Sequence, residues 1–429
     1  MAQTASPADI TAVSNILKEV YPSDEIVSQL NDDALLYSQI QRTKEYHNAA
    51  GNEAVLFTKV GRNTGTSSRS LNGGTLGAAG HQRTKKLVYD YTAHYIQLKI
   101  LGTTIAKMST ARQAAIQTID LEVNGALTDI KKDRQRQIYS DGTGKIATCG
   151  TTTTSTTVNL YTGVTTTGGL PVVYNNNDAI RNGWLGGDTT EPMYVDIGTL
   201  ASPTAVGGDI LVTGATDSDT APTLTVSAAI STTANTHFVF KAGNTAASSV
   251  SYESNGLEGL VNDSGTVGGL ATSTEASWAA AKVVDAAGAS LSRSHMQQAY
   301  RAVRRYGKPD FILTSFEHQE DYYNLLQSQV RFAGDANLAS GKVDGPKFND
   351  RPVSADADCP RGRMYFLDKS HLFMVSAGDI DWQNMNTGGD KLVWVQGEDS
   401  YVAMAKVYEN LGTDKRRAHA KIKNLAVNA

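Results

Sequence analysis

Motifs that could do chemistry are scarce in this sequence, and the nearest to one is a partial phosphate-binding loop. Gly144-Lys145 resembles the end of such a loop, which holds phosphate with glycine backbone and places a Ser or Thr hydroxyl on magnesium. Tyr139 stands where the loop needs its first glycine, and Ile146 stands where the hydroxyl is needed. We therefore expect Gly142 and Gly144 to stop a helix and turn the chain.

Two other groupings have suitable residue types without suitable spacing. The stretch His318-Gln319-Glu320 does not have the spacing of the HExxH zinc pair. Asp356, Asp358 and Cys359 form a small cluster, which we interpret as a tight turn before a proline. The chain has no GxSxG elbow, so a hydrolase triad is left open only as an assembly of distant residues. We predict a protein that is not an enzyme and that uses no catalytic residue, cofactor or metal.

The composition predicts a globular chain with a sizeable core. The 429 residues are 40% hydrophobic and 19% charged, with a formal net charge of −4. Tight binding to nucleic acid usually needs a basic domain, so we expect only loose, non-specific contact with DNA. Cys149 and Cys359 are too few and too far apart for a disulfide framework or a CxxC metal site. No signal peptide or membrane-length apolar run is visible, which predicts cytoplasmic synthesis and no membrane partner.

Three short basic clusters interrupt this acidic balance. They lie at residues 131–136, 301–305 and 415–417. Acidic or apolar residues flank each of them, so we interpret them as solvated or inter-subunit faces.

The first hundred residues contain two segments with no evident core of their own. Residues 1–50 hold short apolar patches that are broken by Pro22. Residues 53–60 and 86–100 alternate as strands, and the polar stretch 61–82 between them holds six glycines. This pattern predicts a two-stranded ribbon with a wide tip, which is marginal alone and must rest on another domain or subunit.

One long helix and a β-rich module follow. Apolar residues recur at helical spacing over 104–140, with Gly125 in the middle, and the DGTG stretch at 141–144 ends the pattern. From 150 to 275, Gly, Asn, Asp and Thr turns separate short segments of strand character. We predict a small all-β module, a barrel or a sandwich, inserted at about 165–250. Its candidate strands are 193–197, 210–213, 223–227 and 238–241.

The last third of the chain returns to mixed α/β structure. Residues 394–408 are predicted to form two strands with a turn at Gly397. The other predicted elements are helices at 292–306 and 316–327 and strands at 310–314, 350–355, 363–367 and 418–425. The predicted fold class is α+β.

Several stretches and the order of these elements carry a family resemblance. Residues 134–144 (RQRQIYSDGTG), 255–261 (NGLEGLV), 309–315 (PDFILTS), 348–382 and 417–425 (RAHAKIKNL) are similar to segments of the major capsid proteins of tailed bacteriophages. The fold of that family, sometimes called the Johnson fold, is shared with the encapsulin nanocompartments. The resemblance covers most of the chain except the module at about 165–250.

The resemblance implies a domain map and a function. The map is an N-terminal arm (1–50), an extended β-ribbon loop (51–100), a spine helix of a peripheral domain (101–141), an axial domain (142–390) holding the β insertion, and C-terminal strands that return to the peripheral domain (391–429). The implied function is that of a major capsid protein, which self-assembles into hexamers and pentamers of an icosahedral head around double-stranded DNA. The implied location is the virion.

The resemblance also implies partners. The arm is too short to contain a built-in scaffolding segment, so a separate scaffolding protein is expected, with a portal during assembly and a possible decoration protein on the β insertion. We expect the arm and the ribbon tip to carry most contacts with other copies of the chain. The candidate contact residues are Arg62, Arg69, Lys85, Lys86, Ile16, Leu17, Leu30, Arg134 and Arg136.

Three alternatives stay open. An encapsulin-type compartment shell would have the same fold around a protein cargo. A β-rich virion surface protein would use the module to bind carbohydrate or a receptor. A covalent cross-link between subunits would join one of the ribbon lysines to an asparagine; the candidates are Lys59, Lys85 and Lys86 with Asn349 and Asn410.

Overall fold

The computed structural model describes residues 34–43, 53–68, 71, 77–103, 112–161, 177–187, 192–218, 221–244, 252–327, 346–378, 380–382 and 393–426. The chain divides into two compact units. Unit 1 comprises Met1–Gln39, Thr92–Gly256 and Ser376–Glu409, and unit 2 comprises Ile40–Tyr91, Leu257–Val375 and Asn410–Ala429. The predicted contact residues Ile16, Leu17, Leu30 and Arg69 lie outside the described residues.

Unit 1 is built along a long antiparallel strand pair. β4 (Thr92–Leu101) pairs with β21 (Ser400–Thr413), with Leu101 opposite Ser400 and Thr92 opposite Glu409. Two short strands, β19 (Asp381–Trp382) and β20 (Val393–Trp394), also pair with β21. The turn predicted at Gly397 is confirmed, since this glycine lies between β20 and β21 with a φ of +89°.

The chain changes partner at Tyr91. The prediction of one strand over 86–100 is wrong, because β3 (Arg83–Asp90) and β4 are separate strands. β3 pairs with β2 (Glu53–Gly61), whereas β4 pairs with β21. Alternation in the sequence indicates an extended chain, but it does not say which strand lies alongside.

The helix α4 (Arg112–Tyr139) carries the apolar stripe that its sequence spacing predicts, and α2 (Leu35–Gln39) packs against it. Its buried apolar residues are Val123, Ala126, Ile130, Ile138 and Tyr139. Gly142 and Gly144 follow the helix with φ values of +79° and +82°. The interpretation of the DGTG stretch as a helix stop is therefore confirmed, and residues 104–111 of the predicted helix lie outside the described part of the chain.

A six-stranded antiparallel barrel follows α4. Its strands are β5 (Lys145–Thr148), β6 (Thr152–Asn159), β7 (Met193–Gly198), β8 (Gly207–Thr216), β9 (Thr223–Thr232) and β10 (Phe238–Lys241), in the order β5-β10-β7-β8-β9-β6. A bridge between Cys149 and Leu160 joins the two edge strands, with Tyr161 N donating to Thr148 O at 2.9 Å. All four predicted strands are confirmed, and the sheet begins at Lys145, before the predicted insertion. The helix α5 (Asn177–Arg181) lies between β6 and β7 in the sequence.

Unit 2 has a mixed six-stranded sheet with helices packed on it. The strand order is β13 (Lys282–Asp285), β22 (Ala420–Lys423), β17 (Met364–Leu367), β14 (Phe311–Thr314), β16 (Arg351–Ala355) and β15 (Lys347–Phe348). The helices α7 (Arg293–Arg304) and α8 (Phe316–Gln327) contribute Met296, Val303 and Tyr322 to one core with the sheet residues Ile312 and Phe366. The predicted helices and strands of this region are all present.

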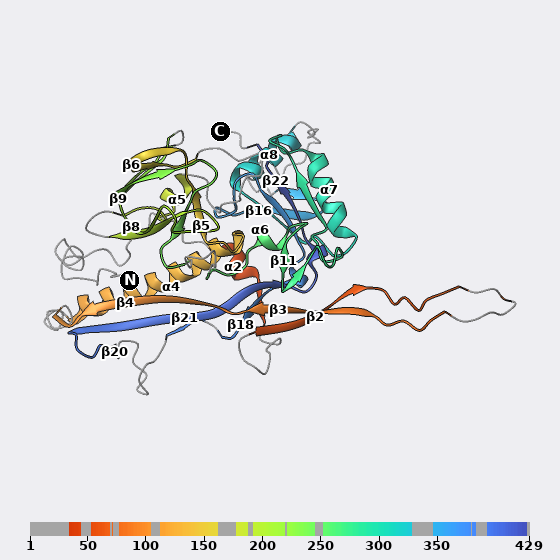
Figure 1. Ribbon diagram of the computed structural model, residues 1–429, viewed down its shortest axis with the longest axis horizontal. Coiled ribbons are helices and arrows are strands. Elements are labelled where there is room, and N and C mark those ends of the chain that lie inside the picture. The colour runs from red at the N-terminus through yellow and green to blue at the C-terminus, as the bar shows by residue number, and fades with distance from the viewer. Residues whose placement is uncertain are drawn as a thin grey trace, which may run out of the picture. The chain divides into compact units, whose positions relative to one another are not determined.

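Unit 2 also contains several smaller elements. They are β1 (Gln41–Thr43), paired in parallel with β18 (Leu372–Ser376), the helix α6 (Leu257–Leu260), the hairpin β11 (Thr266–Val267) with β12 (Leu270–Ala271), and the 3-10 turns Lys369–His371 and Arg416–Ala418. Figure 1 shows these elements and the ribbon formed by β2 and β3.

Two glycines of unit 1 should respond in opposite ways to replacement by alanine. A Cβ at Gly256 would lie 2.5 Å from Gln137 O and closer still to Ser140 O, at the end of α4, whereas a Cβ at Gly125 would meet nothing within 4 Å. We expect Gly256→Ala to lower the free energy of unfolding and Gly125→Ala to raise it by about 1 kcal/mol, the helix-propensity difference. Urea denaturation of both variants, with Gly186→Ala as a control in open space, measures the signs. A neutral Gly256→Ala would contradict the close packing at the helix end.

Candidate functional site

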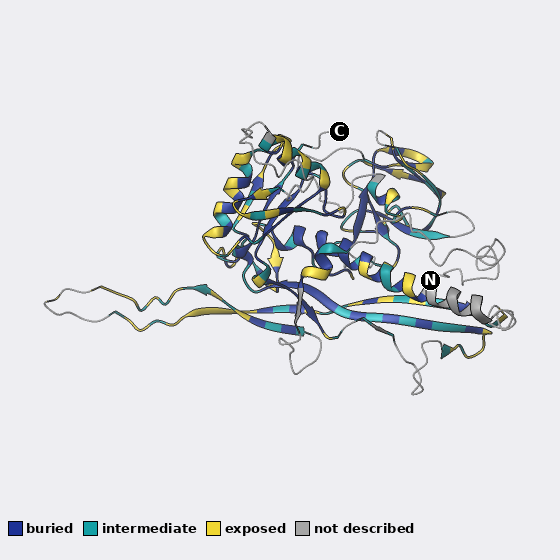
Figure 2. Ribbon diagram, turned by 180° about the vertical axis from the view of Figure 1, so that it is seen from behind, coloured by how far each residue is buried: buried dark blue, intermediate teal, exposed yellow. Residues whose placement is uncertain are grey.

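The ribbon of β2 and β3 is the candidate functional site. The strands are antiparallel, with Leu56 opposite Leu87, and both of these root residues are buried together with Ala54 and Tyr89. Between residues 57 and 86 none of the described residues is buried, and Phe57 is 74% exposed. Figure 2 shows the change from buried root to exposed outer ribbon. Within the described segments the outer ribbon therefore buries no core of its own.

The two arms of the outer ribbon approach each other where both carry glycine. A Cβ on Gly65 would lie 2.6 Å from the backbone N of Gly80, and a Cβ on Gly80 would collide with Gly65 in return. The Gly65 N–H donates to Asn63 Oδ1 at 2.7 Å. Only glycine leaves room for this backbone approach.

The ribbon is a basic segment of an acidic chain. Residues 54–89 contain six of the 39 Lys and Arg residues and none of the 43 Asp and Glu residues, so the rest of the chain has a formal net charge of −10. The predicted contact residues Arg62, Lys85 and Lys86 are exposed on it. This separation of charge favours contact between the ribbon of one molecule and an acidic surface of another.

Tyr89 anchors the root of the ribbon. Its hydroxyl donates to Thr413 O at 2.7 Å and accepts from Thr413 N at 3.2 Å. The ring lies against Gly268 and Gly412, where a Cβ would come within 3.1 Å and 3.4 Å of ring carbons. Burial raises the pKa of the hydroxyl well above its usual value, so the group remains a donor at physiological pH.

Glu275 adds an ion pair beside this anchor. Arg83 Nη2 donates to the two carboxylate oxygens at 2.6 Å and 2.8 Å, and Lys85 Nζ lies 3.9 Å from the nearer oxygen. Ser277 Oγ donates to Val60 O on the other strand at 2.9 Å. Both strands are thus held by the same short segment, which limits the directions in which the ribbon can leave the unit.

Arg416 holds the loop that forms this seat. Its buried guanidinium donates to backbone carbonyls of Leu260 (2.8 Å), Ser264 (2.7 Å), Trp278 (3.1 Å), Gly259 (3.2 Å) and Gly265 (3.5 Å). Burial lowers the pKa of this arginine to about 10, so it remains charged at neutral pH. Removing the side chain would leave these buried carbonyls without a donor, which costs about 1–3 kcal/mol for each such group.

The basic cluster at 131–136 does not form the expected face. Arg134 and Arg136 are fully buried in unit 1, and Lys132 is 6% exposed. The interpretation of this cluster as a solvated or inter-subunit face is wrong. The structure points away from the predicted inter-subunit role of both arginines, because guanidinium groups without exposed surface have nothing to offer a neighbour.

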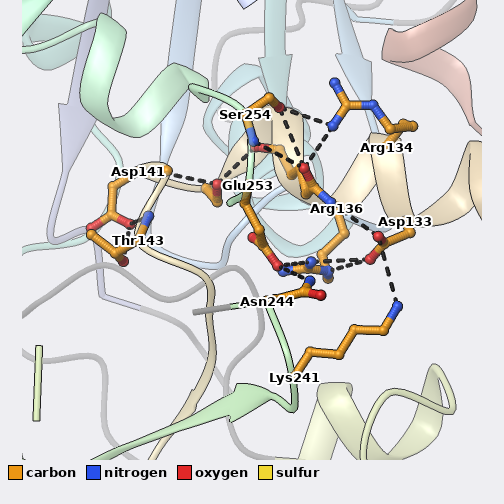
Figure 3. A network of polar contacts seen from close by, with 12 residues as sticks. Asp133, Arg134, Arg136, Asp141, Thr143, Lys241, Asn244, Glu253 and Ser254 are labelled. Atoms are coloured by element: carbon orange, nitrogen blue, oxygen red, sulfur yellow. Dashed lines mark hydrogen bonds and ion pairs between the residues drawn. The ribbon is translucent and has the colours of Figure 1, made fainter. Parts of the chain in front are cut away.

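Arg136 belongs to a buried ion-pair network at the end of α4 (Figure 3). It pairs with Glu253, and its Nε donates to Asp133 Oδ1 at 3.0 Å. Lys241 Nζ lies 3.8 Å from Asp133, and Asn244 Nδ2 donates to Glu253 at 2.8 Å. Burial alone would raise the pKa of Asp133, but the charges of Lys241 and Arg136 hold it well below its usual range.

Arg134 links the same helix end to β21. Its Nε donates to Glu409 Oε1 at 2.8 Å, and Nη1 donates to Gln137 Oε1 at 2.6 Å and to Ser254 Oγ at 3.0 Å. Tyr37 OH donates to the same Glu409 oxygen at 2.9 Å. Breaking such a buried pair by removing one partner typically costs about 3–5 kcal/mol.

The remaining chemical candidates are structural. Asp356 accepts from Asp358 N at 3.0 Å through its side chain and from Cys359 N at 3.1 Å through its backbone, so the predicted turn is confirmed. Asn410, a cross-link candidate, donates its amide to Asp90 O at 2.7 Å within the chain, and Asn349 is exposed. Across the described residues no group of His, Cys, Asp and Glu is arranged to hold a metal ion. None of the helices in the described segments is long and apolar enough to cross a membrane.

Sequence reasoning missed Glu275, and its interpretation of the cluster at 415–417 as a solvated or inter-subunit face is wrong for Arg416, which is buried. Their partners lie 138 to 192 residues away along the chain. No local pattern signals such contacts. The only available sign was Arg416 itself, an arginine followed by the alternating stretch 417–425.

His94 on β4 should make unit 1 sensitive to mild acid. The residue is 8% exposed, and burial together with the charge of Arg134 lowers the pKa of its imidazole to about 2. Between pH 6.5 and 2 the unfolded chain therefore takes up a proton that the folded chain refuses, so stability falls as the pH falls. We expect His94→Gln and His94→Phe both to flatten the slope of unfolding free energy against pH between 6.5 and 5, by up to about 1.4 kcal/mol per pH unit.

Urea titrations at several pH values measure this slope independently of the absolute stability of each variant. A residual slope is expected from His419 in unit 2, because burial lowers the pKa of that imidazole to about 4. Slopes identical to that of the unsubstituted chain in both His94 variants would contradict the assignment.

The chain resembles known proteins in structure but matches none in the sequence comparisons. No protein-family model matches this sequence, and no curated protein sequence matches it. The capsid asymmetric unit of cyanophage A-1(L) is 13% identical and superposes with a TM-score of 0.56, covering 95% of this chain and 97% of that one. The encapsulin complex of Synechococcus elongatus PCC 7942 is 8% identical with a TM-score of 0.46, covering 98% and 96%.

The likeness to the cyanophage capsid chain extends over nearly the whole of both chains. The chain therefore has the fold of this phage capsid chain.

Proposed function

We propose that this chain is a major capsid protein, which assembles into hexamers and pentamers of the icosahedral head of a tailed bacteriophage around double-stranded DNA. The observation that carries the proposal is the outer ribbon, which is seated firmly at its root but buries nothing between residues 57 and 86 among the residues described. A two-stranded ribbon is marginal in water. Lying across a neighbouring subunit would stabilise it.

The role proposed is structural, not catalytic, and places the protein in the virion capsid. By the same analogy the arm would be residues 1–50, the extended loop 51–100, the spine helix 101–141, the axial domain 142–390 and the returning strands 391–429. A scaffolding protein and a portal are proposed partners during assembly in the host cytoplasm. The barrel, which is additional to the elements used in this argument, is the proposed place for a decoration protein.

Two alternative functions have different outcomes in one experiment. An encapsulin-type shell would give closed particles that enclose a protein cargo. A β-rich virion surface protein, which the barrel favours, would not form shells. Negative-stain electron microscopy and size-exclusion chromatography of the expressed chain distinguish them. Closed shells or rings of five and six support the capsid proposal, and a monomer at every concentration, even with a co-expressed scaffold, contradicts it.

Deleting residues 63–80 should abolish shells and leave the chain folded. Because Gly61 lies opposite Arg83, the deletion joins the strands through a short loop of Arg62, His81 and Gln82, a length that hairpins accept. We expect an unchanged circular-dichroism spectrum and no closed particles by electron microscopy. Normal particles from this variant would refute the ribbon as the main contact.

Charge reversal on the ribbon tests the electrostatic part of the contact. Arg62 and Lys86 are exposed, and neither is within ion-pair distance of a carboxylate in the described part of the chain. We expect Arg62→Glu with Lys86→Glu to raise the protein concentration needed for assembly at least tenfold, and added salt to raise it for the unsubstituted chain. Lys282→Glu with Arg305→Glu makes the same change in net charge on exposed positions outside the ribbon. Equal losses in both pairs would contradict a specific role of the ribbon.

A further inference from the structure

The outer face of α7 gathers positive charge from two parts of the sequence. Residues 286–309 contain five Lys and Arg residues and no Asp or Glu. Arg304 and the C-cap residue Arg305 lie three and four positions after Arg301, so both are its neighbours on one side of the helix. All three are exposed, as is Lys308. Figure 2 shows the exposed outer side of α7.

Arg417, from the basic cluster at 415–417, joins this face in the folded chain, whereas Arg416 is buried. The Arg417 guanidinium lies 5.1 Å from the centre of the Tyr306 ring, and its Nη1 donates to the Tyr306 hydroxyl at 3.3 Å. Within the described segments, no carboxylate lies within ion-pair distance of Arg301, Arg304, Arg305 or Lys308. Arg417 and the basic residues of 301–308 therefore form one basic surface, which we call the α7 patch (Arg301, Arg304, Arg305, Lys308 and Arg417).

The α7 patch is held rigidly by the core beneath it. Met296, Ala299 and Val303 are fully buried against the sheet, and the Ser292 hydroxyl accepts from His295 N at 3.2 Å to cap the start of the helix. The three helix arginines are thus presented on a fixed scaffold. Their positive charge is tolerated at this end of α7 because a helix C-terminus carries partial negative charge.

We propose that the α7 patch binds the phosphate backbone of duplex DNA. Arginine forks match phosphate oxygens in pairs, and four of the five groups in the patch are arginines. A docked protein would need an apolar centre to its interface. Tyr306 supplies none, since it is only 39% exposed and Arg417 lies over its ring. Binding of this kind is independent of base sequence and depends steeply on salt.

This inference rests on the proposed function only in taking packaged DNA as the ligand. Binding is measured on the unassembled full-length chain, so the test does not require shells to form. The probe is a fluorescein-labelled 30-base-pair duplex, and the readout is anisotropy across a series of salt concentrations. We compare the unsubstituted chain with Arg301→Gln, Arg304→Gln, Arg305→Gln combined. The matched control, Arg62→Gln, Lys85→Gln, Lys86→Gln combined, removes three exposed charges from the ribbon.

We expect the α7 variant to lose at least tenfold in affinity at 100 mM salt. The plot of log K against log salt should become shallower, with the magnitude of its slope reduced by about 3, close to 0.9 for each phosphate contact removed. The ribbon variant should change both quantities little. Equal losses in the two variants, no loss in the α7 variant, or displacement of the duplex by polyglutamate at equal charge concentration would each overturn the inference. The last of these would indicate an acidic protein partner.

Electron microscopy of the same variants separates this inference from the proposed function. An α7 variant that still forms shells but no longer binds DNA confines the defect to the patch. A chain that binds DNA through the patch and never forms shells would contradict the capsid proposal and leave the inference standing.

Discussion

The structure of unit 2 depends on one constraint, which is that a two-stranded ribbon cannot bury its own side chains. Its root must therefore be fixed by the rest of the unit, and Leu87 and Tyr89 are buried there. None of the described residues from 57 to 86 is buried. The hydroxyl of Tyr89 satisfies both backbone groups of Thr413. Among the described residues the outer part is left exposed, and burial against another molecule would stabilise it.

Buried arginines join separate segments in both units through hydrogen bonds and ion pairs. Arg416 donates to carbonyls of the loop 259–278, while Arg134 and Arg136 join the end of α4 to β21 and to Glu253. Such groups are expensive to bury, and their ion pairs and hydrogen bonds with buried partners offset part of that cost. The arginines left on the surface, on the ribbon and on α7, are the ones available to partners. Buried arginines therefore stabilise the fold, whereas exposed arginines can contact other molecules.

Much of the fold could be predicted from the sequence because its signals are local. The strand 238–241 and the helix 316–327 match β10 and α8 residue for residue, since alternation and helical spacing act over a few neighbouring residues. The glycines after α4 stop the helix as expected. The candidate site was predicted in part, because the basic ribbon and its exposed Arg62, Lys85 and Lys86 follow from composition and pattern. The arm residues Ile16, Leu17 and Leu30 and the tip residue Arg69 stay predictions.

The sequence by itself determined where the chain would be extended, where helical, and that the basic residues of the ribbon are separated from an acidic remainder. Only the tertiary structure decided that 86–100 divides between two partners, that Arg134 and Arg136 face inward, and that residues 301–308 and Arg417 share one surface. The physical reason is distance along the chain. Periodicity is set by neighbouring residues, whereas burial and pairing are set by residues more than a hundred positions away, whose approach depends on the packing of the whole unit.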